Sequence, residues 1–138
     1  MSERDAGVAI VVWRRSPEVE VLLLHRAHFG VDFDGDWAWS TPGGAREPGE
    51  APADAARREL REETGLALAC APVASAIAQA QREIEVSIFA AEAPADSRIV
   101  LSAEHDRYEW VQPAEVTRCL PSWVHQMYDE ALSSLGIL

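Results

Sequence analysis

The sequence predicts an α/β (α+β) fold in which a mixed β-sheet is sandwiched between helices. Two observations predict it: several short segments have the composition or alternation of strands, and two longer segments favour helices. The length of 138 residues suits a single domain with a sizeable core, and no repeat or low-complexity linker divides the chain. We therefore expect one domain over residues 1–138.

Strands are expected on both sides of a central helix. The first two are rich in aliphatic and β-branched residues and are joined by a turn at Ser16 and Pro17. A later strand alternates apolar and polar residues, which is typical of a strand with one buried face. Segment 28–36 is rich in Gly and Asp and is expected to be a loop beside a pocket. The expected strands are 8–13, 19–25, 73–79, 84–88 and 107–111.

The central helix is expected at about 51–64. Pro52 suits a first turn whose N–H groups lack partners, the Ala- and Arg-rich residues after it favour continuation, and Gly65 supplies a left-handed stop. Further helical segments are expected near 113–117 and 121–135, and the second has apolar residues at helical spacing. Its apolar face is either part of the core or the interface of a homodimer.

Three glutamates share one side of the central helix. Glu59, Glu62 and Glu63 fall within an arc of about 100°. On an exposed helix their repulsion costs only a few tenths of a kcal/mol per pair. In a partly enclosed cleft, two such charges about 5 Å apart repel by about 3 kcal/mol, and a divalent cation relieves the repulsion. Glutamate oxygens suit Mg2+ or Mn2+. From these acids alone, a metal site and an exposed acidic face both remain open.

A glycine-rich segment precedes the helix. Residues 40–44 read STPGG and are expected to form a loop whose backbone approaches a ligand or metal. Glu50 is either a first-turn acid favoured by the helix dipole or a partner of Arg58. Residues 44–66 match the pattern Gly-x5-Glu-x7-Arg-Glu-U-x-Glu-Glu-x-Gly-U at every constrained position, where U is aliphatic. This string resembles the signature box of the MutT-like Nudix hydrolases.

The resemblance implies the Nudix fold and a metal site. Glu59, Glu62 and Glu63 would hold divalent ions, Mg2+ or Mn2+, and the backbone carbonyl of Gly43 or Gly44 would be a further ligand. Such a site hydrolyses a phosphoanhydride bond in a nucleoside diphosphate linked to another group.

The resemblance also distinguishes catalytic from structural positions. A carboxylate should accept the proton of the attacking water, and Glu59 is the first choice for this base, with Glu62 second. Glu50 and Arg58 would form an ion pair that fixes the loop against the helix, and Gly65 would end the helix.

Two other functions compete with a hydrolase. A non-catalytic nucleotide sensor on the same fold is the main one, and the complete set of box acids speaks against it. Isopentenyl diphosphate isomerase shares the fold but uses a catalytic cysteine, and Cys70 has no recognisable counterpart there.

A second cluster of functional residues lies outside the box. Residues 102–116, SAEHDRYEWVQPAEV, resemble the EH-x-x-Y-x-W segment of diadenosine tetraphosphate hydrolases and dihydroneopterin triphosphate pyrophosphohydrolases. The resemblance implies that Glu104 reaches the metal cluster, whereas a plain polar loop is the other interpretation. His105 is expected to brace the loop, and Tyr108 and Trp110 are expected to lie in the core.

The substrate is left open among nucleoside triphosphates, dihydroneopterin triphosphate and dinucleoside polyphosphates. Arg26 and Arg46 are expected to contact substrate phosphates, because the guanidinium fork suits phosphate, and Arg14, Arg15 and Arg82 are further candidates. Trp37 and Trp39 lie nearest the glycine loop in sequence. Trp39 is therefore expected to bind substrate, although burial is the commoner fate of Trp.

The negative net charge of the chain disfavours polyanionic partners. The chain has 23 acidic and 12 basic residues, a net charge of −11, and every basic residue is Arg. A field of this sign opposes nucleic acid and anionic lipid, so the expected partner is a small-molecule nucleotide that needs metal to enter. Two cysteines are too few for a disulfide framework. The polar start and the lack of a long apolar run predict no signal peptide or membrane span, so a cytoplasmic location is expected.

Overall fold

The computed structural model describes residues 5–30, 38–79 and 83–137. Trp37, Arg82 and most of the expected loop 28–36 lie outside the described residues. The strands are β1 (Asp5–Arg15), β2 (Val19–Arg26), β3 (Trp39–Ser40), β4 (Gly43–Ala45), β5 (Ala71–Gln79), β6 (Glu83–Glu92) and β7 (His105–Val111). The helices are α1 (Pro52–Thr64), α2 (His125–Ser134) and the 3-10 turns η1 (Ala27–Phe29), η2 (Pro113–Glu115), η3 (Thr117–Cys119) and η4 (Ser122–Val124).

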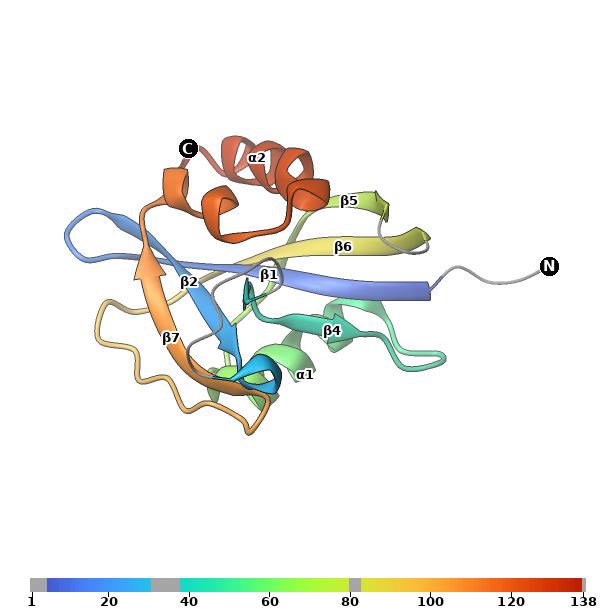
Figure 1. Ribbon diagram of the computed structural model, residues 1–138, viewed down its shortest axis with the longest axis horizontal. Helices are drawn as coiled ribbons and strands as arrows, with labels where there is room; N and C mark the ends of the chain where they lie inside the picture. Colours follow the sequence, from blue (N-terminus) through green and yellow to red (C-terminus); the bar gives the residue numbers. More distant parts are fainter. Residues whose placement is uncertain (1–4, 31–37, 80–82, 138) are drawn as a thin grey trace.

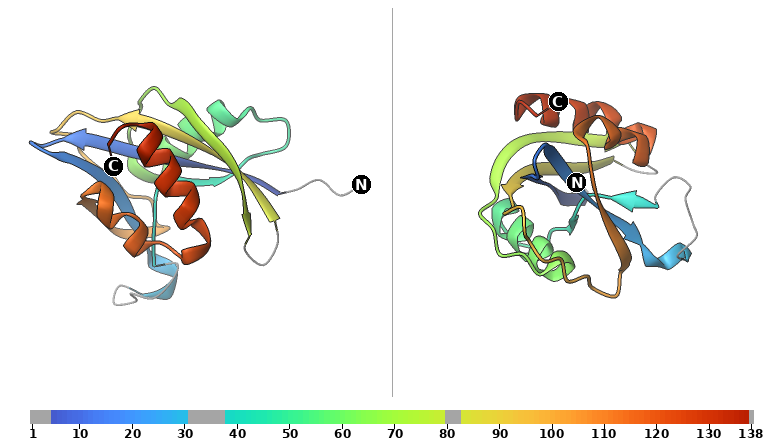
Figure 2. Two further views of the ribbon diagram at one scale, coloured as in Figure 1. Left: turned by 90° about the horizontal axis from the view of Figure 1, so that it is seen from above. Right: turned by 90° about the vertical axis from the view of Figure 1, so that its left-hand side faces the viewer.

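Within the described residues, seven strands form one mixed sheet. The order is β3-β2-β1-β6-β5, with β4 paired to β1 and β7 paired to β2. The pair β1–β6 is parallel and the other pairs are antiparallel. Helices α1 and α2 lie on opposite faces of the sheet (Figure 1; Figure 2). The prediction of a mixed sheet between helices is confirmed.

The sheet has a hydrophobic core on each face because strand side chains alternate. Along β1, Ala9 and Val11 pack on the α2 side, whereas Ile10 and Val12 pack on the α1 side. Strand β1 is therefore apolar without interruption over its central residues, as expected for a strand covered on both faces. The core on the α1 side includes Leu22, Leu24, Ala55, Ala56 and Leu60, and that on the α2 side includes Val21, Leu23, Tyr128, Ala131 and Leu132.

Helix α1 confirms the helix expected at 51–64. Pro52 is in its first turn, and Gly65 ends it with a φ of +77°. Because this left-handed conformation is strained for other residues, Gly65 is the natural stop. The amide of Gly65 donates to the carbonyl of Arg61 over 2.9 Å.

The loop expected at 40–44 is partly strand. Gly43 and Gly44 begin β4, which pairs with Ala9 and Val8 of β1. A Cβ at position 43 would lie 2.2 Å from the carbonyl oxygen of Val8, so glycine permits this close pairing. Glycines have low strand propensity, and that is why composition suggested a loop.

The C-terminal expectations are partly confirmed. The segment near 113–117 forms 3-10 turns, and that at 121–135 begins with η4 before α2. The apolar face of α2 packs in the core on the α2 side, so it is a core face of this chain. No helix among the described residues is long and apolar enough to cross a membrane.

The expectation that Tyr108 lies in the core is wrong. Tyr108 is 41% exposed, whereas Trp110 is half-buried beside the core on the α1 side. The Arg14 guanidinium lies 4.2 Å from the ring centroid of Trp110. Strand β7 pairs with β2 alone among the described strands, so it is an edge strand and its side chains are incompletely covered.

Candidate functional site

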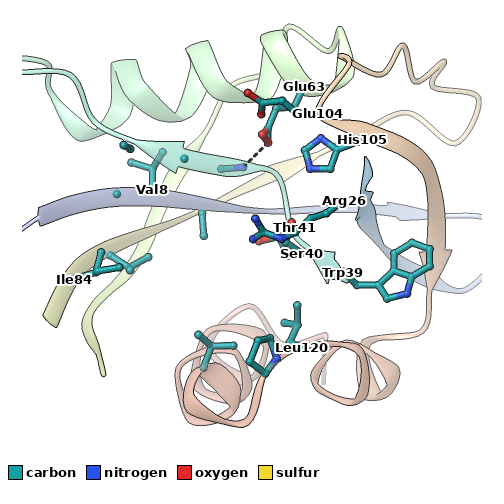
Figure 3. A pocket seen from close by; sticks show the side chains of 18 of the residues that line it. Val8, Arg26, Trp39, Ser40, Thr41, Glu63, Ile84, Glu104, His105 and Leu120 are labelled. Atoms are coloured by element: carbon teal, nitrogen blue, oxygen red, sulfur yellow. Dashed lines mark hydrogen bonds between the residues drawn. The ribbon is translucent and has the colours of Figure 1, made fainter. Parts of the chain in front are cut away.

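A cavity of about 1060 Å³ runs from Glu63 of α1 past the sheet to the C-terminal helices. Figure 3 shows Glu63, Glu104 and His105 together in one part and Leu120 in the opposite part. We call the first part the acid end, lined by Gly43, Gly44, Glu63, Glu104 and His105. We call the second part the apolar end, lined by Ile84, Val86, Leu120, Val124 and Met127.

Glu63 is the most buried acid of the site. Its side chain is on α1 and the residue is only 4% exposed. One carboxylate oxygen accepts the backbone N–H of Gly43 over 2.9 Å. Burial raises the pKa of Glu63 to about 8, and the nearby charges of Glu59 and Glu104 add to this effect, while the Gly43 N–H and Arg26 oppose it.

Glu59 lies against the backbone of Gly44. Its side chain is 13% exposed, and a Cβ at Gly44 would lie 2.7 Å from its carboxylate carbon. The missing side chain at position 44 therefore lets the carboxylate approach the loop. Burial raises the pKa of Glu59, the neighbouring Arg58 lowers it, and the charges of Glu62 and Glu104 raise it further.

Glu62 is placed differently from the other two box acids. Its side chain is 57% exposed, and it accepts a bond from Arg58 over 3.3 Å. Neither Glu62 nor Glu59 is among the described residues that line the cavity. An arc of about 100° spans from the buried edge of a helix to its solvent edge, which explains this gradation from Glu63 to Glu62.

Arg58 joins the loop to the helix. Its Nε and Nη2 donate to the two carboxylate oxygens of Glu50, both over 2.8 Å. Nη1 donates to Glu59 over 2.9 Å, and Nη2 also donates to the carbonyl of Ala45 over 3.1 Å. The Arg58 side chain, together with the Glu47 N–H, lowers the pKa of Glu50 to about 2, and Glu50 raises the pKa of Arg58.

Glu104 and His105 come to the acid end from the start of β7. Ligand-capable atoms of Glu63, Glu104 and His105 all lie within 4.8 Å of one another. His105 is 9% exposed, and its Nδ1 has no hydrogen-bond partner among the residues that the structure describes. Burial lowers the pKa of His105, and Arg26 also lowers it. Sequence reasoning treated His105 as a brace for the loop, whereas the structure places it beside the acids.

The donor set fits a divalent cation. The charge of Glu104 raises the pKa of both Glu59 and Glu63, and the charge of Glu59 raises the pKa of Glu63 further. A cation of charge two is the natural counterion for such a group. Carboxylate oxygen donors suit Mg2+ or Mn2+.

Arg26, Arg46 and Trp39, which are expected to bind substrate, all line the cavity. Arg26 and Arg46 are among its lining residues, and the Nε of Arg26 is buried. Trp39 also lines it, but this residue is only 8% exposed. Its ring packs edge-on against His25 with centroids 5.0 Å apart, so little of it is left for stacking on a ligand.

Thr41 and Tyr128 form a contact that sequence reasoning missed. Their hydroxyl oxygens are 2.5 Å apart, and both residues are buried while lining the cavity. Burial raises the pKa of Tyr128, which stays a neutral phenol. The available signal was a tyrosine within an apolar helical stripe, since a buried phenol needs a partner.

The family model described as NUDIX domain matches residues 3–131. The chain therefore belongs to the Nudix domain family, and the prediction from the signature box is confirmed. Membership supports the prediction of a pyrophosphohydrolase enzyme.

Among curated proteins, the chain is similar to an octanoyltransferase of Myxococcus xanthus. The two are 38% identical over 124 residues. The match covers 86% of this chain and 33% of the relative, so the chain spans about a third of that protein.

Solved structures share the fold. The MutT protein from Methanosarcina mazei Go1 has a TM-score of 0.78 at 21% identity, over 98% of this chain and 99% of that one. The Ap4A hydrolase of C. elegans, in a binary complex, also has a TM-score of 0.78, at 20% identity over 96% and 98% of the two chains.

Proposed function

We propose that this protein is a divalent-metal-dependent hydrolase of a phosphoanhydride bond in a nucleoside diphosphate linked to another group. The observation that carries the proposal is the placement of Glu59 and Glu63 against the Gly43–Gly44 backbone, with Glu104 beside Glu63 and a cavity large enough for a nucleotide next to them. Membership of the Nudix family agrees with this activity.

Glu59, Glu63 and Glu104 would hold Mg2+ or Mn2+, with a backbone carbonyl of Gly43 or Gly44 as a further ligand. Glu62 would contribute from the solvent side of the same helix. When bound, the ion neutralises phosphate charge, lowers the pKa of water and stabilises the leaving oxygen.

Glu59 is the proposed general base, with Glu62 as the second choice. A base needs a fixed position and a pKa raised toward the working pH. Glu59 has both properties, because Arg58 donates a hydrogen bond to its carboxylate and burial raises its pKa. Glu62 is more exposed and is held over a longer distance.

Arg26 and Arg46 are proposed to bind substrate phosphates, since both line the cavity and carry the charge that phosphates require. The apolar end would enclose the remaining part of the substrate, and the small exposed part of Trp39 would add to its wall. Nucleoside triphosphates, dihydroneopterin triphosphate and dinucleoside polyphosphates each carry phosphates for the acid end and a flat heteroaromatic ring whose faces can pack against apolar side chains.

The test is a panel of these three substrate classes, assayed for product release with Mg2+ and with Mn2+. The proposal expects turnover of at least one class that chelation of the metal abolishes. Saturable nucleotide binding without turnover in either metal would instead favour the alternative, a non-catalytic nucleotide sensor.

A further inference from the structure

Strand β7 begins with a β-bulge, which lies beside the acid end. In the pairing with β2, His25 faces Arg107 and Arg26 faces His105. Two steps along β7 thus correspond to one step along β2, so Asp106 is the extra residue.

The bulge decides which face of the sheet His105 occupies. Arg107 shares the face of His25, where its guanidinium lies 5.3 Å from the ring centroid of Trp39. In a regular strand, His105 would share that face with Arg107, because residues two apart point the same way. The extra residue places His105 instead beside Arg26, on the face of β2 that continues toward α1 and Glu63.

His25 holds the bulge. Its Nδ1 lies 2.7 Å from a carboxylate oxygen of Asp106, and the imidazole is completely buried. Edge-on packing against Trp39 fixes the imidazole ring. On the chain just before the bulge, the amide of Ala27 donates to the carbonyl of Glu104 over 3.0 Å. Asp106 is therefore attached to β2, and Glu104 is attached to the 3-10 turn η1 that follows β2.

The Nδ1 of His105 has no hydrogen-bond partner within residues 5–30, 38–79 and 83–137. The residue is buried, and no described group bonds its Nδ1. Its ring is directed toward Glu63 and Glu104 (Figure 3), and ligand-capable atoms of the three side chains lie within 4.8 Å of one another. Buried polar groups are nearly always bonded, so an orphaned nitrogen beside two carboxylates points to a missing ligand.

We propose that His105 is a nitrogen ligand of the divalent ion held by Glu63 and Glu104, and that His25 and Asp106 position it. This inference rests on the metal site of the proposed function and names one more ligand for it. An imidazole among carboxylates favours Mn2+ over Mg2+, because Mg2+ prefers oxygen donors only.

The test loads the purified full-length chain with Mn2+ alone and records its electron spin echo envelope modulation, with Mn2+ and Mg2+ affinities from titration. The expected result is modulation from a coordinated nitrogen in the parent protein. His105→Gln should abolish it and lower the preference for Mn2+ over Mg2+ by about tenfold or more.

The positioning role is tested on the same strand. Asp106→Ala should weaken the nitrogen modulation and Mn2+ affinity, whereas Asp106→Asn should restore both, because its amide oxygen still accepts from an imidazole N–H. Glu109→Ala is the matched control, since this exposed residue of β7 carries the same charge. If Asp106→Ala behaves like Glu109→Ala, the positioning role is wrong; if it does not fold, the recovery in Asp106→Asn decides.

The same measurements distinguish the loss of the His105 ligand from the loss of the whole metal site. If the parent protein binds Mn2+ without nitrogen modulation and His105→Gln leaves the metal preference unchanged, then His105 is not a ligand, but the carboxylate site stands. If the parent protein binds no divalent ion, both proposals fall.

Discussion

The acid end and the apolar end of the cavity are built in different ways. Most of the acid end comes from one short stretch, in which Gly43, Gly44 and Glu63 are joined by a loop and a helix that also carries Glu59 beside them. The apolar end combines β6 with the segments around Leu120 and α2, which are distant in sequence from each other. A short stretch can specify chemistry by local spacing, whereas the enclosing surface depends on how remote elements pack.

Glu59→Gln should give the largest effect and tests the acid end alone. The amide keeps the shape but cannot accept the proton, so turnover should fall by about 10²–10⁴-fold. Steady-state kinetics with saturating metal measures the loss, and circular dichroism checks that the fold is retained. Near-normal turnover would remove Glu59 from the role of base.

Gly44→Ala and Gly43→Ala should separate function from stability at adjacent positions. A Cβ at Gly44 meets the Glu59 carboxylate, whereas one at Gly43 meets the backbone of Val8. We expect Gly44→Ala to lower turnover about tenfold to a hundredfold with a modest change in melting temperature. Gly43→Ala should mainly destabilise the fold, by about 1–3 kcal/mol in chemical denaturation. Equal effects of the two variants on stability and turnover would contradict this separation.

The pH dependence of stability should also be specific to the acid end. In the folded protein without metal, Glu63 keeps its proton up to about pH 8, whereas an ordinary glutamate loses it near 4.5. The stability that this group contributes is thus complete below pH 4.5 and is lost as the pH rises toward 8. The free energy of unfolding should therefore fall over this pH range by on the order of a few kcal/mol, and thermal melts should show a falling melting temperature.

Metal should reverse that decline, because an ion binds the carboxylate and not the acid. Mn2+ should therefore raise the melting temperature more at pH 8 than at pH 6, and Glu63→Gln should remove both effects. A parent protein whose stability does not change between pH 5 and 8 would show that Glu63 is not held as described.

Tyr128→Phe should give the smallest effect and tests the structure near the apolar end. It removes the bond to Thr41 and leaves that buried hydroxyl without its partner, which costs about 1–2 kcal/mol. Substrate KM should rise, whereas Mn2+ affinity should stay unchanged because the contact lies away from the carboxylates. A change in Mn2+ affinity as large as that in KM would mean that the two ends are coupled.

The difference between local spacing and the packing of remote elements explains which features could be predicted from the sequence. Helix α1 and its stop at Gly65 depend on residues within one short stretch, so spacing and residue type were sufficient. For Glu50 the residues alone left two roles open, and the resemblance to the signature box indicated its ion pair with Arg58. Glu104 was suggested by a short motif, and the structure places it beside Glu63.

Other features depend on pairing between distant residues. Strand β4, which begins at Gly43 and Gly44, does not have the composition of a strand and forms because its backbone pairs with β1. The bulge at Asp106 is visible only through the register with His25, which lies 81 residues away. The exposure of Tyr108 follows from the position of β7 at the sheet edge. None of these is encoded by local spacing.

The most direct test of the central claim is anomalous diffraction from crystals grown with Mn2+. We expect one strong peak bounded by the carboxylates of Glu59, Glu63 and Glu104 at the acid end of the cavity. A map without a peak there, with these side chains ordered and turned to solvent, would contradict the proposed metal site and the hydrolase activity that depends on it.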